Sequence, residues 1–340
     1  MKKNVIILSM LVSSLSMLFV SCEPQNTQTE DSVVSMLEAG VMKGELKEDY
    51  TLDPAVNYSL TGAFVVSKGA KLIIPAGTSI VANASNGAET ETYIAVMMGS
   101  KIQIEGTADQ AVVMRSPNGN PGDWGGLTIC GRAVTTEGAP ATAEVGNFQY
   151  GGSNPADNSG SISYLVIIGA GAAINPESEY NGLTLYAVGS GTTVNNVAIM
   201  NGSDDGVEFF GGSVSVSNLY LENNEDDAID WTEGWDGTVT NAYVKHTISN
   251  FSTVVEADGV NNNPRINNLT AVSTHPGIAL QFKKQSGATM TNVYLEGYST
   301  LVDMKDEGPL SNVIIEGNTA TLEGPYQTGQ LDISAWNWFK

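Results

Sequence analysis

The sequence predicts an all-β fold, a single-stranded right-handed parallel β-helix with an internal asparagine ladder. Short β-branched segments recur between Gly, Asn, Asp and Ser residues, a pattern typical of brief strands separated by turns. One six-residue phrase with asparagine at its third position also returns at intervals near 22 residues. A period this short fits one coil of a β-helix, in which each coil adds a few strands and stacks on the previous coil.

The repeated phrase defines one bend of each coil. Its six copies carry Asn196, Asn218, Asn241, Asn268, Asn292 and Asn312. Residues 162–167 look like an earlier copy in which Tyr164 replaces the asparagine. Asparagine tolerates the left-handed backbone conformation that a tight bend requires. Equivalent amides on stacked coils lie about 4.8 Å apart, close enough to bond one another. We therefore expect an asparagine ladder along one bend of the β-helix.

The first 22 residues have the layout of a secretory signal peptide. A basic start at Lys2 and Lys3 precedes an apolar run over residues 5–20, which is too short for a comfortable membrane span. The run ends in Ser21-Cys22, and a small residue before a cysteine resembles the lipobox of bacterial lipoproteins. This resemblance implies lipidation of Cys22 and attachment to a membrane through acyl chains. The alternative is an ordinary cleaved signal peptide in which Cys22 has no role.

The remaining chain divides into a tether and a domain. Residues 23–49 are polar, rich in Gln, Thr and acidic residues, and are predicted to form a flexible tether. Residues 50–340 form the predicted β-helix domain. Residues 138–156 and 171–181 lengthen two coils and should form loops on its flank. The apolar residues 335–339 are expected to cap the last coil, because an exposed strand edge invites aggregation.

The chain is strongly acidic, with a formal net charge of −22 at pH 7. Such a field repels nucleic acid and anionic membrane surfaces, so we expect no nucleic-acid partner. It also disfavours a polyanionic substrate unless cations intervene.

Acidic residues are predicted to line one face of adjacent coils. Glu208 and Asp230 each follow a ladder asparagine by 12 residues, so they occupy equivalent outward positions while their neighbours point inward. The aspartate pairs at 204–205 and 226–227 stack at the preceding bend, and Glu256 is expected to continue the row one coil later. Stacked carboxylates repel each other, and this crowding should raise some of their pKa values.

Three interpretations of these carboxylates remain open. The aspartate pairs can cap bends by accepting hydrogen bonds from backbone N–H groups, with the outward acids solvated. A bound Ca²⁺ would relieve the repulsion with hard oxygen ligands and needs no His or Cys. A glycosidase pair is the third interpretation, because carboxyls one coil apart lie near the separation of about 5 Å found in retaining enzymes. The candidate calcium ligands are Asp204, Asp205, Glu208, Asp226, Asp227 and Asp230.

A second row of interest lies two residues after each asparagine of the phrase. Its members are Ala198, Tyr220, Tyr243, Thr270, Tyr294 and Ile314. If this row faces solvent, Tyr220 and Tyr243 stack on neighbouring coils, and aromatic faces suit sugar rings. We therefore take Tyr220, Tyr243 and Tyr294 as candidate glycan contacts. The alternative is cross-strand stacking that only stabilises the sheet.

The basic residues do not favour catalysis. The parallel β-helix is the fold of pectate lyases and polygalacturonases, but a fold alone does not grant a function. Lyases of this fold place an Arg or Lys base beside calcium. The nearest basic residues here are predicted in other coils, namely Lys245, Arg265, Lys283 and Lys284. The Gly-His-Gly and Arg-x-Lys motifs of polygalacturonases are absent from the sequence, and His246 and His275 are expected in surface or loop positions.

Three motifs carry a family resemblance: Asp123-Trp124-Gly125-Gly126 and the acidic and aromatic segments 204–212 and 226–235. With these motifs the chain resembles a widespread group of exported β-helix lipoproteins of Bacteroidetes. The resemblance implies a cell-envelope location at the outer membrane, on the cell surface or the periplasmic face, and it implies no activity.

We therefore expect a non-enzymatic lipoprotein that presents a rigid β-helix to a glycan or to a partner envelope protein. The alternative is a carbohydrate-active enzyme, a polysaccharide lyase or a glycoside hydrolase, that uses the acidic residues with or without calcium.

Overall fold

The computed structural model describes residues 32–84, 92–175, 178–259 and 263–340. Residues Ser32–Lys340 form one compact unit. The predicted signal peptide and the predicted lipidation at Cys22 lie outside the described residues. Within the described ranges, no helix has the length and apolar character needed to cross a membrane.

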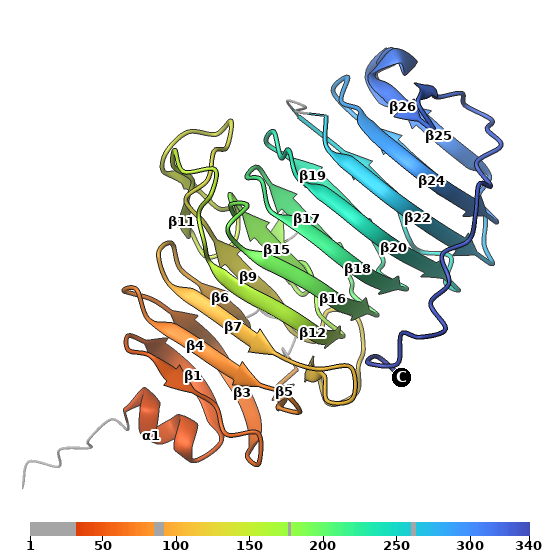
Figure 1. Cartoon of the computed structure of the whole chain (residues 1–340). Coiled ribbons are helices and arrows are strands. Elements are labelled where there is room, and N and C mark those ends of the chain that lie inside the picture. Colours follow the sequence, from red (N-terminus) through yellow and green to blue (C-terminus); the bar gives the residue numbers. More distant parts are fainter. Residues whose placement is uncertain (1–31, 85–91, 176–177, 260–262) are drawn as a thin grey trace, which may run out of the picture. The chain divides into compact units, whose positions relative to one another are not determined.

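The compact unit is a parallel β-helix built from three ladders of stacked strands (Figure 1), so the predicted fold is confirmed. The long strands from β12 onward bend near their middle, and their two halves belong to the first and second ladders, whereas the halves of β3 belong to the second and third. The first ladder contains β2 (Tyr50–Thr51), β4 (Lys71–Pro75), β7 (Lys101–Glu105), the first halves of β12 (Gly160–Ile168), β16 (Thr193–Met200), β18 (Ser215–Glu222), β20 (Thr238–His246), β22 (Arg265–Ser273) and β24 (Ala288–Glu296), and β26 (Val313–Ile315).

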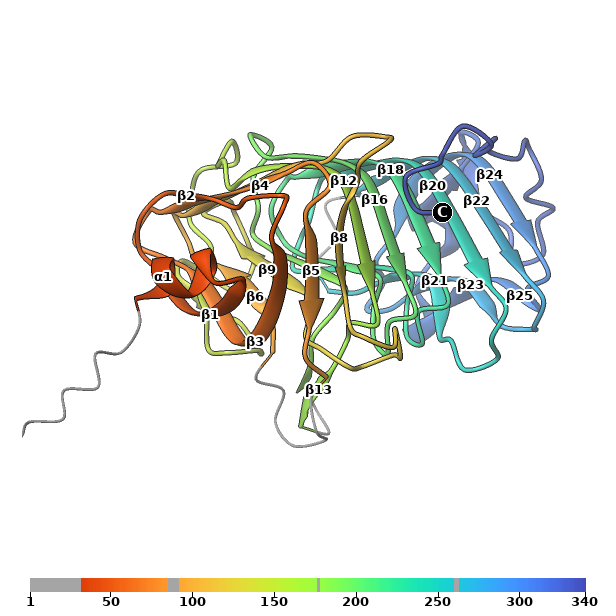
Figure 2. The same cartoon turned by 90° about the horizontal axis from the view of Figure 1, so that it is seen from below.

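The second ladder lies beside the first along the same long strands (Figure 2). It contains the first half of β3 (Asn57–Val66), β5 (Ser79–Ala82), β8 (Val112–Arg115) and the second halves of β12, β16, β18, β20, β22 and β24. The third ladder contains the second half of β3, β6 (Ile94–Val96), β9 (Leu127–Cys130), β15 (Leu183–Tyr186), β17 (Val207–Phe210), β19 (Ile229–Thr232), β21 (Thr253–Ala257), β23 (Ile278–Phe282) and β25 (Thr300–Met304).

Strand residues alternate between the interior and the outer face, as the sequence predicts. In β17, Val207 and Phe209 belong to the continuous apolar core, while Glu208 between them points outward. In β19, Trp231 is in the core and Asp230 points outward. The same alternation therefore places the carboxylates of neighbouring coils on one outer face.

The asparagine ladder is present at the bend between the first and second ladders. Tyr164 and the asparagines from Asn196 to Asn292 have φ between 52° and 63°, the left-handed conformation predicted for this bend. The amide of each asparagine from Asn218 to Asn292 donates to the amide oxygen one coil earlier, with N–O distances of 2.7 to 2.9 Å. The ladder holds the coils in register.

Asn312 is not part of the ladder, so this member of the prediction was wrong. β26 pairs with β24 in a register that places Val313 opposite Ala288. The 3₁₀ turns η1 (Lys305–Glu307) and η2 (Leu310–Asn312) lie between β25 and β26. The amide of Asn312 donates to the carbonyl of Gln285 instead. The spacing from Asn292 to Asn312 is 20 residues, fewer than the other repeats use, and is too short to complete a coil.

The β-helix begins before the predicted boundary at residue 50. Val33–Glu38 form α1, and Val41–Leu46 form β1, which pairs in parallel with β3. Leu37 of α1 is fully buried in the core. The predicted flexible tether 23–49 is therefore structured from α1 onward, because the apolar side chains of α1 and β1 complete the core at the first coil and cover its strand edge.

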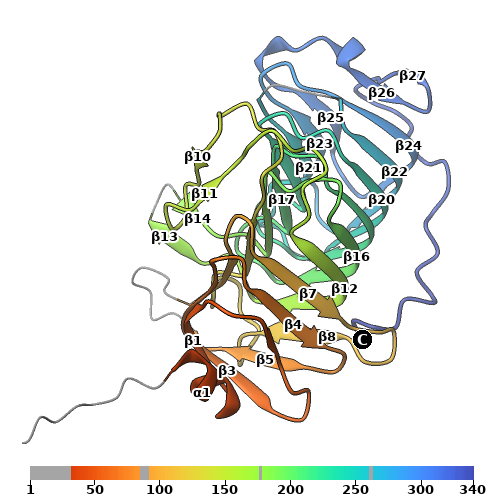
Figure 3. The ribbon, with the colours of Figure 1, turned by 60° about the vertical axis from the view of Figure 1, so that its left-hand side comes forward.

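Two antiparallel hairpins project from the coils within the predicted loop segments. The first is β10 (Ala141–Thr142) with β11 (Gln149–Tyr150), and the second is β13 (Ala173–Asn175) with β14 (Ser178–Glu179). Figure 3 shows both on one side of the coils. Tyr150 of β11 packs in one apolar cluster with Tyr186 and Phe210, which point outward from β15 and β17. The hairpins therefore cover part of the outer face of the third ladder.

The C-terminal segment does not cap the last coil, and this prediction was wrong. After β27 (Asn318–Thr319) pairs with β26, the chain runs back along the outer face of the second ladder (Figure 1). Trp336 and Trp338 are buried against Val166, Ala198 and Tyr220. This face offers an apolar patch that can bury the aromatic rings of the tail, and burial of apolar surface decides where the tail packs.

Candidate functional site

The predicted acidic row is present on the outer face of the third ladder. β17, β19 and β21 pair in parallel with Glu208, Asp230 and Glu256 opposite one another, and we call these three residues the acidic row. The row continues as Thr184 on β15 at one end and Gln281 on β23 at the other. The prediction that Glu256 follows Asp230 one coil later is confirmed.

Five of the six predicted metal ligands lie in two overlapping groups. Carboxylate oxygens of Asp205, Glu208 and Asp230 lie within 4.8 Å of one another, and so do those of Asp204, Asp205 and Asp226. Asp205 belongs to both groups. We call these five residues, Asp204, Asp205, Glu208, Asp226 and Asp230, the carboxylate cluster.

The sixth predicted ligand, Asp227, is outside both groups. Its backbone N–H donates to Oδ1 of Asp205 across one coil at 2.9 Å. Asp205 therefore caps a bend, as one interpretation of the aspartate pairs predicted, and also takes part in the cluster.

Burial and mutual repulsion raise the pKa values in the cluster. For Asp205, Glu208 and Asp230 the pKa lies well above the ordinary value, first because burial disfavours the charged form and then because neighbouring carboxylates repel it. The same causes raise the pKa of Asp204 and of Asp227 to about 8. The cluster must therefore be offset by protons or by a bound cation.

Neutral oxygens extend the cluster. Asn181 donates its amide N–H to Glu208, while its buried Oδ1 has no hydrogen-bond partner among the described residues. Two further buried oxygens also lack a hydrogen-bond partner among the described residues. They are Oγ1 of Thr184, which lies opposite Glu208 in the ladder, and Oδ1 of Asp230. A buried polar group without a partner costs about 1–3 kcal/mol. Ca²⁺ takes about six to eight oxygens from carboxylates, amide and backbone carbonyls and water, so the carboxylates and the amide oxygen of Asn181 are of the type that fits calcium.

A lysine lies at the end of the acidic row, which corrects the prediction that the basic residues are out of reach in other coils. Lys283 follows β23 and forms an ion pair with Glu256. Burial lowers the pKa of Lys283, but the hydrogen bond and charge of Glu256 outweigh burial, and the pKa lies above its ordinary value. A lysine held protonated cannot act as a base. Lys283 instead neutralises one end of the row.

A cavity of about 270 Å³ adjoins the cluster at the β10–β11 hairpin, and we call it the hairpin cavity. Its lining combines aromatic rings and carboxylates, namely Tyr150, Tyr186, Phe210, Glu137, Glu144 and Glu233, with Ala141 and Thr142. Tyr186 links the cavity to the cluster, because the charges of both Glu144 and Glu208 act on its hydroxyl. Burial is the main reason that the pKa of this hydroxyl is raised.

Sequence reasoning missed the cavity residues. Glu137, Glu144 and Tyr150 come from the segment between β9 and β12, which has no repeat to indicate its contacts. The hydroxyl of Tyr150 donates to Glu233, 83 residues away, at 2.7 Å. The only available signal was the unusual length of this segment, which indicated a loop on the flank but not its target.

The row of residues that lie two positions after each asparagine of the phrase, which we call the tyrosine row, is partly covered, and this burial corrects the prediction of Tyr220 as a glycan contact. Tyr220 is only 5% exposed, because the ring of Phe339 stacks on it with centroids 3.9 Å apart. Tyr220 and Tyr243 also stack as predicted, at 5.9 Å. Tyr243 and Tyr294 are half-buried. Cross-strand stacking and the tail therefore account for Tyr220.

The remaining members of the tyrosine row do not form a platform. Ala198 and Thr270 are fully buried, and Ile314 lies in β26 opposite Thr289 instead of continuing the row.

His246 is also buried, contrary to prediction, and its Nδ1 lies 3.0 Å from the hydroxyl of Tyr298.

Comparison with known families identifies the fold family. A model of the pectate-lyase-like β-helix domain matches residues 44–324. The chain therefore belongs to the pectate-lyase-like β-helix family. A search among curated proteins gave no match.

One solved structure shows a remote likeness. It is a variant of the catalytic domain of a GH87 alpha-1,3-glucanase in complex with tetrasaccharides, 11% identical, with a TM-score of 0.25. The match covers 81% of this chain and 64% of that domain.

Proposed function

We propose that this member of the pectate-lyase-like β-helix family is a non-enzymatic, membrane-anchored protein of the cell envelope that binds a glycan beside a calcium ion. One observation carries the proposal: Asp205, Glu208 and Asp230 converge within 4.8 Å of one another, next to the hairpin cavity. The carboxylates repel one another, and a bound cation would offset this repulsion. The cavity offers the aromatic faces and the few convergent polar groups by which proteins hold sugars.

Calcium has a structural role in this proposal. The charges of Glu144 near β10 and Glu179 of β14 act on the carboxylate cluster, so both hairpins bring further negative charge to a crowded face. Lys283 pairs with Glu256 at the far end of the acidic row, and its charge also interacts with Asp230, whereas the pKa of Asp205 is raised by burial and by neighbouring carboxylates. A divalent cation at Asp205, Glu208 and Asp230 would offset the repulsion and hold the hairpins in place around the cavity.

Thermal unfolding tests the calcium site. Millimolar Ca²⁺ should raise the melting temperature, because a ligand of the folded state alone adds about 2.7 kcal/mol of stability at 100 times its Kd. Asp230→Asn should abolish the increase. Asp303→Asn is the matched control, because Asp303 points from the same face two coils beyond Glu256 and lies outside the cluster.

Sodium at matched ionic strength separates site binding from general screening. Equal shifts of the melting temperature with sodium and with calcium would rule out a calcium site, and the aspartates would then serve only to cap bends.

A second function, glycoside hydrolysis, is favoured by one observation. Oxygens of Glu208 and Asp230 lie within 4.8 Å of one another, near the separation of about 5 Å typical of retaining glycosidases. Such an enzyme needs one protonated carboxyl group as the acid and one free carboxylate as the nucleophile, whereas a calcium ion bound between Glu208 and Asp230 would hold both groups ionised and coordinated. We therefore expect a glycan panel incubated with the calcium-loaded chain to give binding without new reducing ends. Product release lost in Glu208→Gln would establish the enzyme instead.

The membrane location rests on the basic start, the apolar run and Ser21-Cys22. Mass spectrometry of membrane-extracted protein should find an acylated N-terminus at Cys22, and Cys22→Ala should release the protein to the soluble fraction. A variant that stays in the membrane would rule out the lipobox interpretation.

A further inference from the structure

The hairpin cavity combines negative charge with aromatic walls and has no basic residue in its lining. We propose that it binds a protonated amino sugar, with the ammonium group between Glu144 and Glu233 and the sugar ring against Tyr186 and Phe210. This inference rests on the proposed glycan-binding function and names the class of glycan. Carboxylates and aromatic faces both attract an ammonium group, and aromatic faces also pack on the apolar face of a sugar.

Glu233 is held in a defined position for such a contact. Its backbone has φ of 54°, the left-handed conformation that is uncommon for a residue with a side chain. Its carboxylate accepts hydrogen bonds from the hydroxyls of Thr135 and Tyr150, which belong to the segment carrying the β10–β11 hairpin. Two neutral donors orient the carboxylate and leave its charge uncompensated within the cavity.

The hydroxyl of Tyr186 is the second observation that indicates a ligand. Tyr186 is 1% exposed, lines the cavity, and its hydroxyl has no hydrogen-bond partner among the described residues. A buried hydroxyl without a partner is costly, and a sugar hydroxyl within the cavity would satisfy it. Tyr186 stacks on Phe210 with centroids 4.2 Å apart, so the two rings form one wall.

The geometry favours an organic cation over a metal ion at this position. Among the described residues, Glu137, Glu144 and Glu233 do not form a group whose oxygens lie within the 4.8 Å that marks the carboxylate cluster. The cavity of about 270 Å³ is also far larger than an ion or a single water, whose share of liquid volume is about 30 Å³. Its breadth and aromatic wall suit a ring better than the slender side chain of a lysine.

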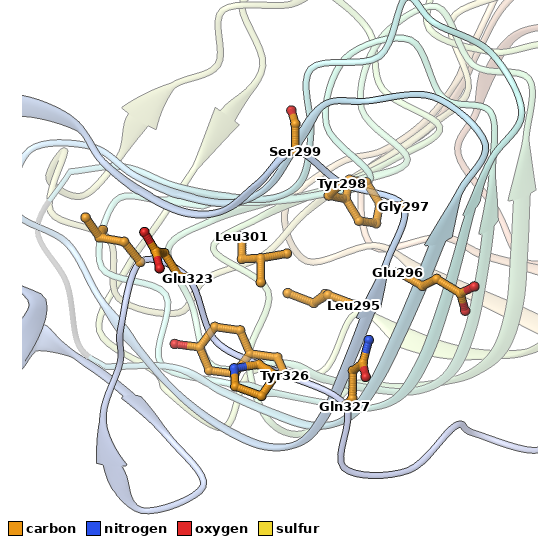
Figure 4. Close-up of a pocket in the computed structure, with 11 residues that line it drawn as sticks. Leu295, Glu296, Gly297, Tyr298, Ser299, Leu301, Glu323, Tyr326 and Gln327 are labelled. Carbon is orange, nitrogen blue, oxygen red and sulfur yellow. The ribbon is translucent and has the colours of Figure 1, made fainter.

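A second cavity lacks one feature of the hairpin cavity, which is a buried tyrosine hydroxyl without a hydrogen-bond partner among the described residues. It measures about 440 Å³, lies near the last coil, and is lined by Leu301, Tyr326, Glu323 and Gln327 among others (Figure 4). The hydroxyl of Tyr326 is already bonded, because it donates to the carbonyl of Thr321 at 2.7 Å. The hydroxyl of Tyr298, the other tyrosine in this lining, lies 3.0 Å from Nδ1 of His246. Both tyrosine hydroxyls of the larger cavity therefore have partners, and the cavity supplies the control residue Glu323.

Calorimetry of the full chain in detergent with calcium tests the inference. The probes are β-1,4-linked tetramers of glucosamine, N-acetylglucosamine and glucose, with trilysine as the peptide cation. The glucosamine tetramer should bind at least about tenfold more tightly than the N-acetylated tetramer, because acetylation removes the charge and keeps the ring. Added salt should weaken only the glucosamine tetramer.

Variants locate the contact. Glu233→Gln and Glu144→Gln should each lower the affinity for the glucosamine tetramer about tenfold and leave that for the N-acetylated tetramer unchanged. Glu144 is exposed, so its variant keeps the test valid if Glu233→Gln fails to fold. Tyr186→Phe should weaken both sugars, and Glu323→Gln should weaken neither.

Each other outcome overturns a defined statement. Equal affinity for the glucosamine and N-acetylated tetramers overturns the amino-sugar inference and leaves the glycan-binding proposal standing. Binding of no sugar overturns both. Trilysine binding as tightly as the glucosamine tetramer assigns the cavity to a lysine of a protein partner and overturns the inference as well.

Discussion

The outer faces of the second and third ladders come from the same repeat but are covered in different ways. On the third ladder, the β10–β11 hairpin leaves a cavity of about 270 Å³ beside the carboxylate cluster. On the second ladder, the C-terminal tail lies directly on the side chains and leaves Tyr220 only 5% exposed. The repeat sets the spacing of outward residues on both faces, whereas the segments outside the repeat decide which face keeps room for a ligand.

The difference in covering follows from what each face offers. The second ladder presents apolar and aromatic side chains such as Val166 and Tyr220, and Trp336, Trp338 and Phe339 bury their rings there. The third ladder presents carboxylates, which an apolar segment cannot cover without leaving buried charges unpaired. The β10–β11 hairpin packs its apolar residues on the outward rings of Tyr186 and Phe210, beside these carboxylates, while its acidic residues Glu137 and Glu144 line the cavity that remains.

Removing the tail should have the largest effect on this comparison. Deletion of residues 329–340 exposes three aromatic contacts, each worth about 1.5–3 kcal/mol, so the free energy of unfolding should fall by roughly 5 kcal/mol in denaturant titrations. The calcium response of the carboxylate cluster should persist. Asn337→Ala, an exposed residue between the two tryptophans, should leave stability unchanged. A truncated chain as stable as the full one would show that the tail does not pack on the tyrosine row.

The pH dependence of stability should distinguish the acidic face from the apolar one. The pKa of Asp204 and Asp227 rises from 3.8 to about 8 in the folded chain, and the pKa values of Asp205 and Asp230 also lie well above the ordinary value. A raised carboxyl pKa favours folding below the ordinary value, and this contribution is lost as the pH increases through the folded value. Without calcium, the melting temperature should therefore fall between about pH 4 and pH 8.

Calcium should flatten this profile, because the cation replaces the protons that otherwise offset the cluster. Melting curves recorded with chelator and with saturating calcium give the comparison. A melting temperature that increases from pH 4 to pH 8 in chelator would contradict the raised pKa values and, with them, the burial of the cluster.

The smallest effect is expected from the ladder that both faces share. Asn241 donates to Asn218 and accepts from Asn268, so Asn241→Ala should cost about 1–3 kcal/mol. Asn312→Ala should cost less, because Asn312 is outside the ladder and its single bond is exposed. Chemical denaturation measures both. Equal small losses would argue against a continuous ladder that holds both outer faces in register.

The sequence was sufficient for those parts of the candidate site that lie within the repeat. The spacing of 12 residues from Asn196 to Glu208 and from Asn218 to Asp230 predicted that these carboxylates face outward on adjacent coils, and β17 and β19 confirm it. The prediction holds because strand alternation and coil length are local properties that each repeat carries for itself. The lipidation of Cys22 and the calcium ligation remain predictions.

Tertiary structure alone decided where the segments outside the repeat pack. The hydroxyl of Thr135 donates to Glu233 across 98 residues, and the backbone N–H of Leu331 donates to Thr270 across 61 residues. No periodicity in the sequence links these pairs, because each contact depends on which surface the finished coils present. The repeat therefore determined the β-helix and the acidic row, whereas apolar burial by the tail and hydrogen bonding by the hairpin segment determined the covered tyrosine row and the hairpin cavity.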